Sequence, residues 1–198
     1  MTKIELIRKN VMKYKLFTAV LFGLIFTVSA FGQQTTREVL TLEKNWRFHN
    51  GDVVNGYSKS LNDSKWEKVT VPHDWAIKGS FDKAIDIQNV AIVQNGEKFA
   101  TEKTGRTGAL PYIGVGWYRN EFSIPNFSSD KKVILLFEGA MSEPEFFING
   151  KKIGSWNYGY SYFYFDITPH ILGNSENTLA VKLTNREISS RWYPGAGL

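Results

Sequence analysis

Residues 145–156, EFFINGKKIGSW, decide the fold of this chain. They contain a first run, EFFI, and a second run, KKIGSW, with Asn149 and Gly150 between them. An Asn-Gly pair between two such runs is the strongest short-range signal for a β-hairpin, because both central residues of a type I′ turn need a positive φ. The stretch therefore predicts two antiparallel strands joined by a tight turn.

Similar short runs continue on both sides of this hairpin, and none after the N-terminal segment has the period of an amphipathic helix. The other runs with β-strand character are residues 39–48, 66–71, 116–124, 132–137, 162–167 and 178–184. About eight short strands separated by turn signals predict an all-β fold, a jelly-roll β-sandwich. Residues 73–115 are irregular and rich in glycine, and a connection of that length is usually functional or mobile.

Two of these runs make specific predictions about burial. Alternation in residues 116–124 (GWYRNEFSI) places Trp117 and Arg119 on one face and Tyr118 and Phe122 on the other. Residues 132–137 (KVILLF) are nearly all apolar, which is typical of a strand buried on both faces or of a strand in the centre of a sandwich.

Residues 1–32 are predicted to form a secretory signal peptide. Basic residues up to Lys15 precede an apolar stretch, residues 16–28, and small residues at Ala30 and Gly32 fit a cleavage site before Gln33. The apolar stretch is short for a bilayer span of about 20 residues, which favours cleavage over a membrane anchor. We expect export to the periplasm or the cell exterior, no stable membrane insertion after cleavage, and one sandwich domain over residues 33–198.

The charge of the chain argues against nucleic-acid binding. The net charge is +5, but residues 1–32 hold five of the basic residues and one of the acids, so residues 33–198 carry 19 basic and 18 acidic side chains. A nearly neutral domain lacks the overall basic charge that nucleic acids and anionic membranes attract. An uncharged sugar is a compatible partner. The chain has no cysteine and therefore no disulfide.

Few residues could carry catalysis. Glu143 and Glu145 are two positions apart, so a strand would place them on one face, as in a glycosidase carboxylate pair. The favoured interpretation is a solvated strand edge beside the hairpin. A Ser/His/Asp triad could be assembled from His73 and Asp74, but no nucleophile-elbow motif supports it.

Neither a metal nor a cofactor is expected. The three histidines, His49, His73 and His170, lack the spacing of zinc ligands. The glycines Gly114 and Gly116 are not followed by a third glycine at the spacing of a phosphate-binding loop.

The aromatic stretch 156–165, WNYGYSYFYF, is the most distinctive feature of the composition. Aromatic faces stack on sugars and bury a large area at a low entropic cost, which is the functional interpretation. Packing within the core or against another domain is the alternative, and we favour it.

Several segments, in a fixed order, carry a family resemblance. They are NWRF (45–48), VPHDW (71–75), GWYR (116–119), FEGAMSEPEFFINGKKIG (137–154), YGYSYFYFDIT (158–168), NTLAVKLTN (177–185) and SRWYPGAGL (190–198). Together they resemble the N-terminal sugar-binding jelly-roll domain of glycoside hydrolase family 2, the β-galactosidase and β-glucuronidase family. The version here is most similar to exported β-galactosidase-type members from Bacteroidetes-like bacteria.

The resemblance implies a retaining glycoside hydrolase whose two catalytic glutamates lie in a TIM-barrel domain far downstream. It therefore implies that this chain holds no catalytic residue, is inactive alone, and is a fragment incomplete at its C-terminal end. The implied partners are a β-galactoside or related carbohydrate and the downstream domains of the same enzyme. A stand-alone carbohydrate-binding module and a structural sandwich remain the alternatives, and the oligomeric state is left open.

The resemblance also points to sugar-contacting positions. Two polar side chains that family members direct at the active site align with Ile113 and Arg191, and neither residue matches. Arg191 can still donate hydrogen bonds to a hydroxyl or pair with a substrate acid. Arg191, Trp192 and Tyr193 are the predicted substrate-binding residues.

Overall fold

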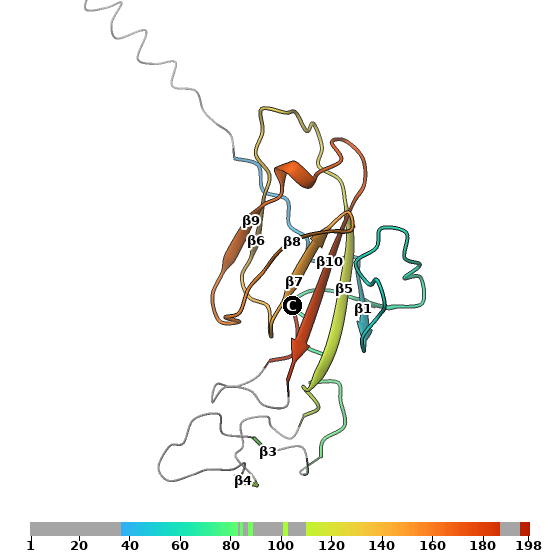
Figure 1. Ribbon diagram of the computed structural model, residues 1–198, viewed down its shortest axis with the longest axis vertical. Coiled ribbons are helices and arrows are strands. Elements are labelled where there is room, and N and C mark those ends of the chain that lie inside the picture. Colours follow the sequence, from blue (N-terminus) through green and yellow to red (C-terminus); the bar gives the residue numbers. More distant parts are fainter. Residues whose placement is uncertain (1–36, 83, 85–86, 89–100, 103–109, 187–194) are drawn as a thin grey trace, which may run out of the picture. The chain divides into compact units, whose positions relative to one another are not determined.

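The protein is described by a computed structural model that places residues 37–82, 84, 87–88, 101–102, 110–186 and 195–198 (Figure 1). The chain divides into two units, Met1–Leu40 and Thr41–Leu198, and the second contains all the strands. The predicted signal peptide lies outside the described residues. Within the described part, no helix is long and apolar enough to cross a membrane.

Antiparallel strands build the whole fold. A six-stranded sheet has the order β2-β1-β5-β10-β7-β8, and two pairs, β6-β9 and β3-β4, form smaller sheets. The strands are β1 (Trp46–Asn50), β2 (Glu67–Val69), β3 (Ile87–Gln88), β4 (Thr101–Glu102), β5 (Gly114–Phe122), β6 (Ile134–Phe137), β7 (Glu145–Ile148), β8 (Lys151–Ser155), β9 (Phe163–Asp166) and β10 (Asn177–Asn185). A short 3₁₀ helix, η2 (Thr168–His170), follows β9.

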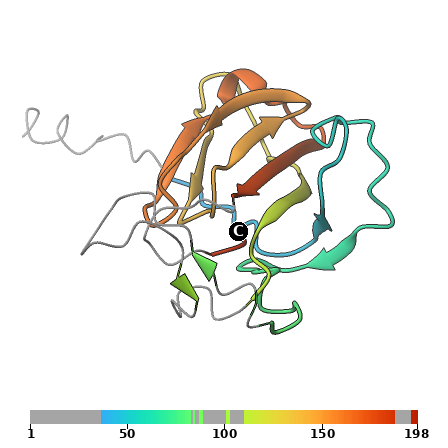
Figure 2. The same cartoon turned by 60° about the horizontal axis from the view of Figure 1, so that its bottom comes forward.

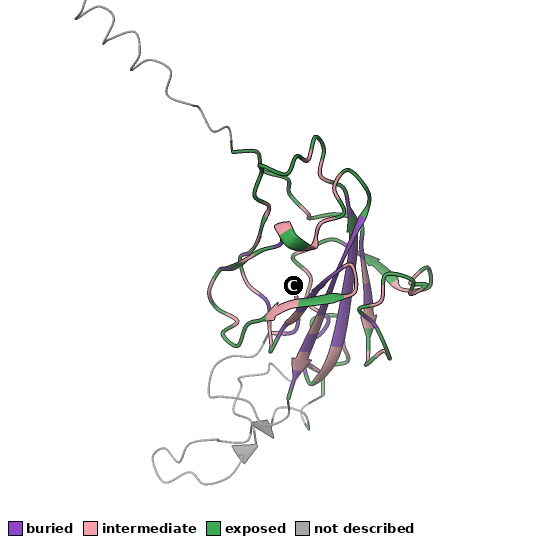
Figure 3. Cartoon of the chain, turned by 45° about the horizontal axis from the view of Figure 1, so that its top comes forward, coloured by how far each residue is buried: buried purple, intermediate pink, exposed green. Residues whose placement is uncertain are grey.

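Strands β5 and β10 form the centre of the large sheet. They pair over nine residues each, from Gly114 opposite Asn185 to Phe122 opposite Asn177. Figure 3 shows these strands buried along most of their length. The connecting segments therefore leave the sheet at the ends of these two strands. Figure 2 shows the molecule from the end at which β5 begins and β10 ends.

The predicted alternation along β5 is confirmed. Tyr118 and Phe122 belong to the main core, whereas Trp117 belongs to a second cluster with Phe147 and Ala180. Both faces of this strand are buried because residues 51–66, between β1 and β2, contact its outer face. A Cβ on Gly56, for example, would lie within 3 Å of the Trp117 ring.

The main hydrophobic core lies between the six-stranded sheet and the β6-β9 pair. Phe146 of β7 is fully buried, and its ring centroid lies 4.5 Å from that of Phe137 in β6 and 5.3 Å from that of Phe163 in β9. Burial of each such side chain stabilises the folded state by about 1.5–3 kcal/mol relative to leaving it exposed to water. This aromatic contact between the large sheet and the β6-β9 pair makes the fold a β-sandwich.

The hairpin prediction is confirmed in its details. Asn149 and Gly150 connect β7 to β8 with φ values of 50° and 82°, as a type I′ turn requires. The Asn149 side chain also donates hydrogen bonds to the His170 carbonyl (2.9 Å) and to the Asn177 side-chain oxygen (2.8 Å). The turn is thereby joined to the segment that leads into β10.

The prediction that residues 132–137 form a strand buried on both faces is wrong. Ile134 and Leu136 of β6 are 49% and 50% exposed, and only Phe137 is buried. The reason is that β6 pairs with β9 alone. Among the described residues, nothing covers the outer face of this two-stranded sheet, so its apolar side chains remain in contact with water.

Candidate functional site

The last residues of the chain join two distant segments of the fold. The His73 amide donates to the Leu198 carbonyl (2.8 Å) and the Leu198 amide donates back to His73 (3.1 Å). Met141 and Gly197 exchange two further backbone hydrogen bonds of 3.0 Å each. Residues 195–198 therefore lie between the VPHDW segment and Met141, and we call them the closing segment. A Cβ at Gly197 would collide with the His73 carbonyl.

Asp74 holds this arrangement through its side chain. One carboxylate oxygen accepts from the Ala76 amide (2.8 Å) and the other from the Ala196 amide (3.3 Å). A carboxylate that accepts backbone N–H groups satisfies donors that would otherwise lose their hydrogen bonds on burial. Asp74 thus fixes the closing segment, and its carboxylate is occupied by the backbone.

His73 has a structural setting as well. Its Nδ1 shares a 2.7 Å hydrogen bond with the Tyr118 hydroxyl, while its Nε2 is buried without a partner among the described residues. Burial lowers the pKa of the His73 imidazole and raises the pKa of the Tyr118 hydroxyl. Among the described residues, the side chains of His73 and Asp74 hydrogen-bond to the Tyr118 hydroxyl and to backbone amides and not to a serine, so the geometry does not support a Ser/His/Asp triad.

The predicted binding residues Arg191, Trp192 and Tyr193 lie outside the described residues. Both flanks of their segment are described and lie together. The Asn185 side-chain amide donates to the Gly195 carbonyl (2.9 Å) and to the Tyr112 carbonyl (3.0 Å). The Gly195 amide donates to the Met141 sulfur (2.7 Å).

Ile113 belongs to the same end of the sandwich. It directly precedes Gly114, which pairs with Asn185 in the β5-β10 register, and it is 44% exposed. The structure therefore places Ile113, one of the two positions that the resemblance aligned with sugar contacts, beside the flanks of the segment that contains Arg191.

Three further buried polar atoms occur at or near this end: Trp75 Nε1, Tyr112 Oη and the Asn185 side-chain oxygen. None has a hydrogen-bond partner among the described residues. A buried polar group without a partner costs about 1–3 kcal/mol. Among the described residues, the buried polar atoms without a hydrogen-bond partner lie at or near this end of the sandwich. At the turn around Asn149, by contrast, the side-chain amide donates two hydrogen bonds.

The two candidate carboxylates, Glu143 and Glu145, do not form a catalytic pair. Glu143 makes a bidentate ion pair with Arg186, with contacts of 2.9–3.0 Å. Glu145 pairs instead with Lys152 at 3.2 Å. Each carboxylate has its own cation, which supports the interpretation as solvated charges at a strand edge. The described residues also contain no group of three metal-ligating side chains.

The aromatic stretch 156–165 divides between the two interpretations. Phe163 is buried in the core, and Trp156 stacks on it with ring centroids 5.2 Å apart. The tyrosines point outward, with Tyr162 and Tyr164 72% and 65% exposed. The stretch also lies beside Met141, because a Cβ at Gly159 would come within 2.7 Å of the Met141 side chain. Met141 in turn contacts the closing segment through its hydrogen bonds with Gly195 and Gly197.

Sequence reasoning missed Asn185 and Met141, which hold the closing segment in place. An asparagine at the end of the TLAVKLTN run is a signal that could have identified the first, because Asn often satisfies backbone groups where a strand ends. Nothing in the sequence around Met141 indicates a sulfur that accepts a hydrogen bond from a residue 54 positions away.

Comparison with known proteins gives one consistent match. The family model described as "Glycosyl hydrolases family 2, sugar binding domain" matches residues 39–197. The β-galactosidase BoGH2A of Bacteroides ovatus is 36% identical over 165 residues, and a putative β-glucuronidase of Formosa agariphila is 35% identical over 155. These matches cover 82% and 78% of this chain but only 17% and 13% of the relatives, so the chain spans less than a fifth of their length.

Comparison with solved structures gives similar relatives. A β-glycosidase from Bacteroides vulgatus is 36% identical and superimposes with a TM-score of 0.65, covering 81% of this chain and 19% of that one. A family 2 glycosyl hydrolase from Bacteroides cellulosilyticus is 30% identical, with a TM-score of 0.63 over 80% of this chain and 19% of that one.

Proposed function

The chain belongs to the glycosyl hydrolases family 2, through its sugar binding domain, and from this premise we propose that it is the accessory sugar-binding domain of a β-galactosidase-type hydrolase. In this proposal the complete enzyme hydrolyses O-glycosidic bonds of β-galactosides or related glycosides. The two catalytic carboxylates are supplied by further domains, and this chain alone is inactive. The fold is of the jelly-roll type.

The observation that carries the proposal is the placement of the closing segment. Hydrogen bonds from Asn185 and Met141 hold both flanks of residues 187–194 at the end of the sandwich where Ile113 is exposed. A sugar that reached this end would meet Arg191, Trp192 and Tyr193 in our proposal. Arg191 would donate hydrogen bonds to a hydroxyl or to a carboxylate of the substrate, and the two aromatic residues would stack on it.

The substrate class is supported by the relatives. The names of BoGH2A and of the Formosa agariphila protein give a β-galactosidase and a putative β-glucuronidase. A β-galactoside and a β-glucuronide are both β-linked pyranosides; they differ in the configuration at C4 and in the group attached to C5, which is a hydroxymethyl group in the first and a carboxylate in the second. We favour a β-galactoside because the first of these relatives covers more of the chain.

An activity assay and a binding assay test this function. The 198-residue chain is incubated with aryl β-galactosides and aryl β-glucuronides, and we expect no turnover above background. Titration calorimetry with galactosides and glucuronides measures binding, with Arg191→Ala as the variant and Arg37→Ala, which lies before the sandwich, as the control. Turnover by the isolated chain would refute the accessory role, and absence of heat at millimolar sugar would refute direct sugar binding.

We also propose that residues 1–32 direct export, so that the domain acts in the periplasm or outside the cell. The support is the basic segment, the apolar stretch 16–28 and the small residues Ala30 and Gly32. N-terminal sequencing of the exported protein tests this: a mature N-terminus at Gln33 is expected, and recovery of the uncleaved chain from the cytoplasm would contradict it.

The exposed tyrosines favour a second candidate function, a carbohydrate-binding module that acts without a catalytic partner. Tyr158 and Tyr160 lie with ring centroids 5.9 Å apart, and Tyr162 and Tyr164 are exposed on the same stretch. Loss of affinity for galacto-oligosaccharides in Tyr162→Ala, with no loss in Arg191→Ala, would favour this module over the accessory domain. The purely structural alternative predicts that Trp192→Ala and Tyr193→Ala change folding and leave sugar affinity unaltered.

A further inference from the structure

A row of three cationic side chains crosses the outer face of the large sheet. Arg47 of β1 is the register partner of Lys68 in β2 and of Arg119 in β5. Residues directly opposite in antiparallel strands project to the same face with Cβ atoms about 4.5–5.5 Å apart. Like charges in these positions repel, so the row costs free energy unless anions lie nearby.

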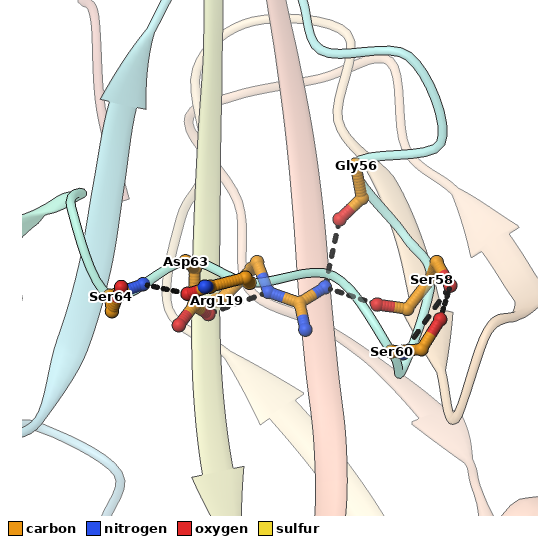
Figure 4. A network of polar contacts seen from close by, with 7 residues as sticks. Gly56, Ser58, Ser60, Asp63, Ser64 and Arg119 are labelled. Atoms are coloured by element: carbon orange, nitrogen blue, oxygen red, sulfur yellow. Dashed lines mark hydrogen bonds and ion pairs between the residues drawn. The ribbon is translucent and has the colours of Figure 1, made fainter.

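Arg119 makes three hydrogen bonds to neighbouring residues of the protein (Figure 4). Its Nε donates to Asp63 (2.8 Å), and its Nη1 donates to the carbonyls of Gly56 and Ser58 (2.9 Å each). The Arg119 side chain is only 2% exposed. Asp63 thus neutralises this member of the row, and the Arg119 side chain, which also lines the groove described below, offers almost no accessible surface to a ligand.

Arg47 and Lys68 have no such partner. Within the described part of the chain, neither side chain makes an ion pair with a carboxylate. The adjacent acid on β2, Glu67, pairs instead with Lys78 at 2.6 Å. Two neighbouring cations are therefore left without an internal anion, although the domain as a whole is nearly neutral.

These two cations line a groove of about 860 Å³. Lys44, Lys78 and the edge of Pro72 also line it, together with three acids, of which Asp63 is already paired with Arg119. Ligand sites are usually clefts of about 300–1,000 Å³ in which a few polar groups point at the ligand. Glu121 and Glu176 line the groove as well and make no ion pair among the described residues, so its wall is mixed in charge. Arg47 and Lys68 are the adjacent pair of cations in this wall, and the groove has the volume of a ligand site.

We propose that this groove binds an acidic saccharide through its carboxylate or sulfate groups, with Arg47 and Lys68 as the principal contacts. The planar guanidinium of Arg47 matches an oxyanion with two parallel N–H donors, and the Lys68 ammonium adds a point charge beside it. The saccharide class follows from the membership in a sugar binding domain family. The proposed site includes none of residues 191–193, so it can fail or hold independently of the proposed catalytic partnership.

Affinity electrophoresis of the 198-residue chain tests the proposal. Native gels contain polygalacturonate for carboxylate groups, dextran sulfate for sulfate groups, or unsubstituted dextran. We expect retardation in one or both acidic gels, and weakening of it as NaCl is raised from about 0.05 M to about 0.2 M, because salt screens exposed charges. The double variant Arg47→Gln/Lys68→Gln should lose about tenfold or more in apparent affinity.

Two controls make the result decisive. Lys151→Gln/Lys152→Gln removes the same charge from β8, at the opposite edge of the sheet, and should bind like the parent chain. Circular dichroism verifies the fold of each variant. The proposal is overturned if neither acidic gel retards the parent chain, or if the two double variants lose affinity equally. It is also overturned if an oligonucleotide binds through Arg47 and Lys68 while the acidic polysaccharides do not bind.

Discussion

The side-chain amide of Asn185 lies 2.9 Å from the carbonyl oxygen of Gly195 and donates a hydrogen bond to it. This contact joins the last residue of β10 to the first residue of the closing segment. The same amide reaches the Tyr112 carbonyl at 3.0 Å. One asparagine therefore connects the end of β10, the approach to β5 and the end of the chain.

Substitution of Asn185 by alanine should loosen this end of the sandwich. The Tyr112 carbonyl, in a buried hydrogen bond, and the Gly195 carbonyl, in a partly buried one, would lose their donor. The loss at a buried group costs about 1–3 kcal/mol. We expect a decrease of about 2–4 kcal/mol in the free energy of unfolding, measured by urea denaturation. Asn157→Ala, at an exposed position between β8 and β9, is the control and should lie within about 0.5 kcal/mol of the parent chain. Equal stability of the two variants would contradict the role given to Asn185.

The ion pair of Arg119 with Asp63 predicts a contrast between buried and exposed charges. Asp63→Asn leaves the 2%-exposed Arg119 side chain without a carboxylate, and breaking a buried pair costs about 3–5 kcal/mol. Because Asp63 is itself 21% exposed, we expect the lower end of that range. Glu67→Gln breaks the exposed pair with Lys78 and should cost less than about 1 kcal/mol. Chemical denaturation of both variants would reveal the difference, and similar losses would contradict it.

The sequence predicted the parts of the fold that depend on local signals. Asn149 and Gly150 gave the hairpin because a type I′ turn needs two positive φ values, and few other residue pairs tolerate them. Alternation in residues 116–124 gave the correct faces of β5 because the side-chain period of a strand is two wherever it pairs.

The failures have a common physical cause, which is that burial depends on neighbours distant in sequence. Residues 132–137 are apolar enough for a central strand, yet β6 lies in a two-stranded sheet with an outer face open to solvent. In the aromatic stretch, Phe163 faces the core and Tyr164 faces outward, which composition alone did not separate. The row of Arg47, Lys68 and Arg119 arises from strand register between segments far apart in the chain, and no local pattern indicates it.

The aromatic contact between the sheets predicts a large effect of Phe146→Ala. This side chain is fully buried against three phenylalanines, and phenylalanine-to-alanine changes in cores cost about 3–5 kcal/mol. Tyr164→Ala removes a ring of similar size from β9, but Tyr164 is 65% exposed. This substitution should therefore lower the free energy of unfolding by about 0.5 kcal/mol or less. Thermal unfolding of both variants tests the sandwich arrangement, and a small effect at Phe146 would argue against it.

The burial of His73 predicts how stability changes with pH. Burial lowers the pKa of its imidazole below the ordinary value of 6.5. As the pH falls through 6.5, the unfolded chain takes up a proton that the native chain still excludes, so the free energy of unfolding decreases. The decrease stops only below the native pKa, where both states are protonated.

Urea denaturation at a series of pH values from about 8 to about 5 measures this dependence. Replacement of His73 by glutamine removes the titrating group, so the variant should show a shallower loss of stability toward acid pH than the parent chain. His170→Gln is the matched control, since it removes a histidine from η2 that is not in contact with Tyr118, and it should retain the parental slope. If the slope of His73→Gln equals that of the parent, another group carries the acid sensitivity, and the buried neutral state assigned to His73 is incorrect.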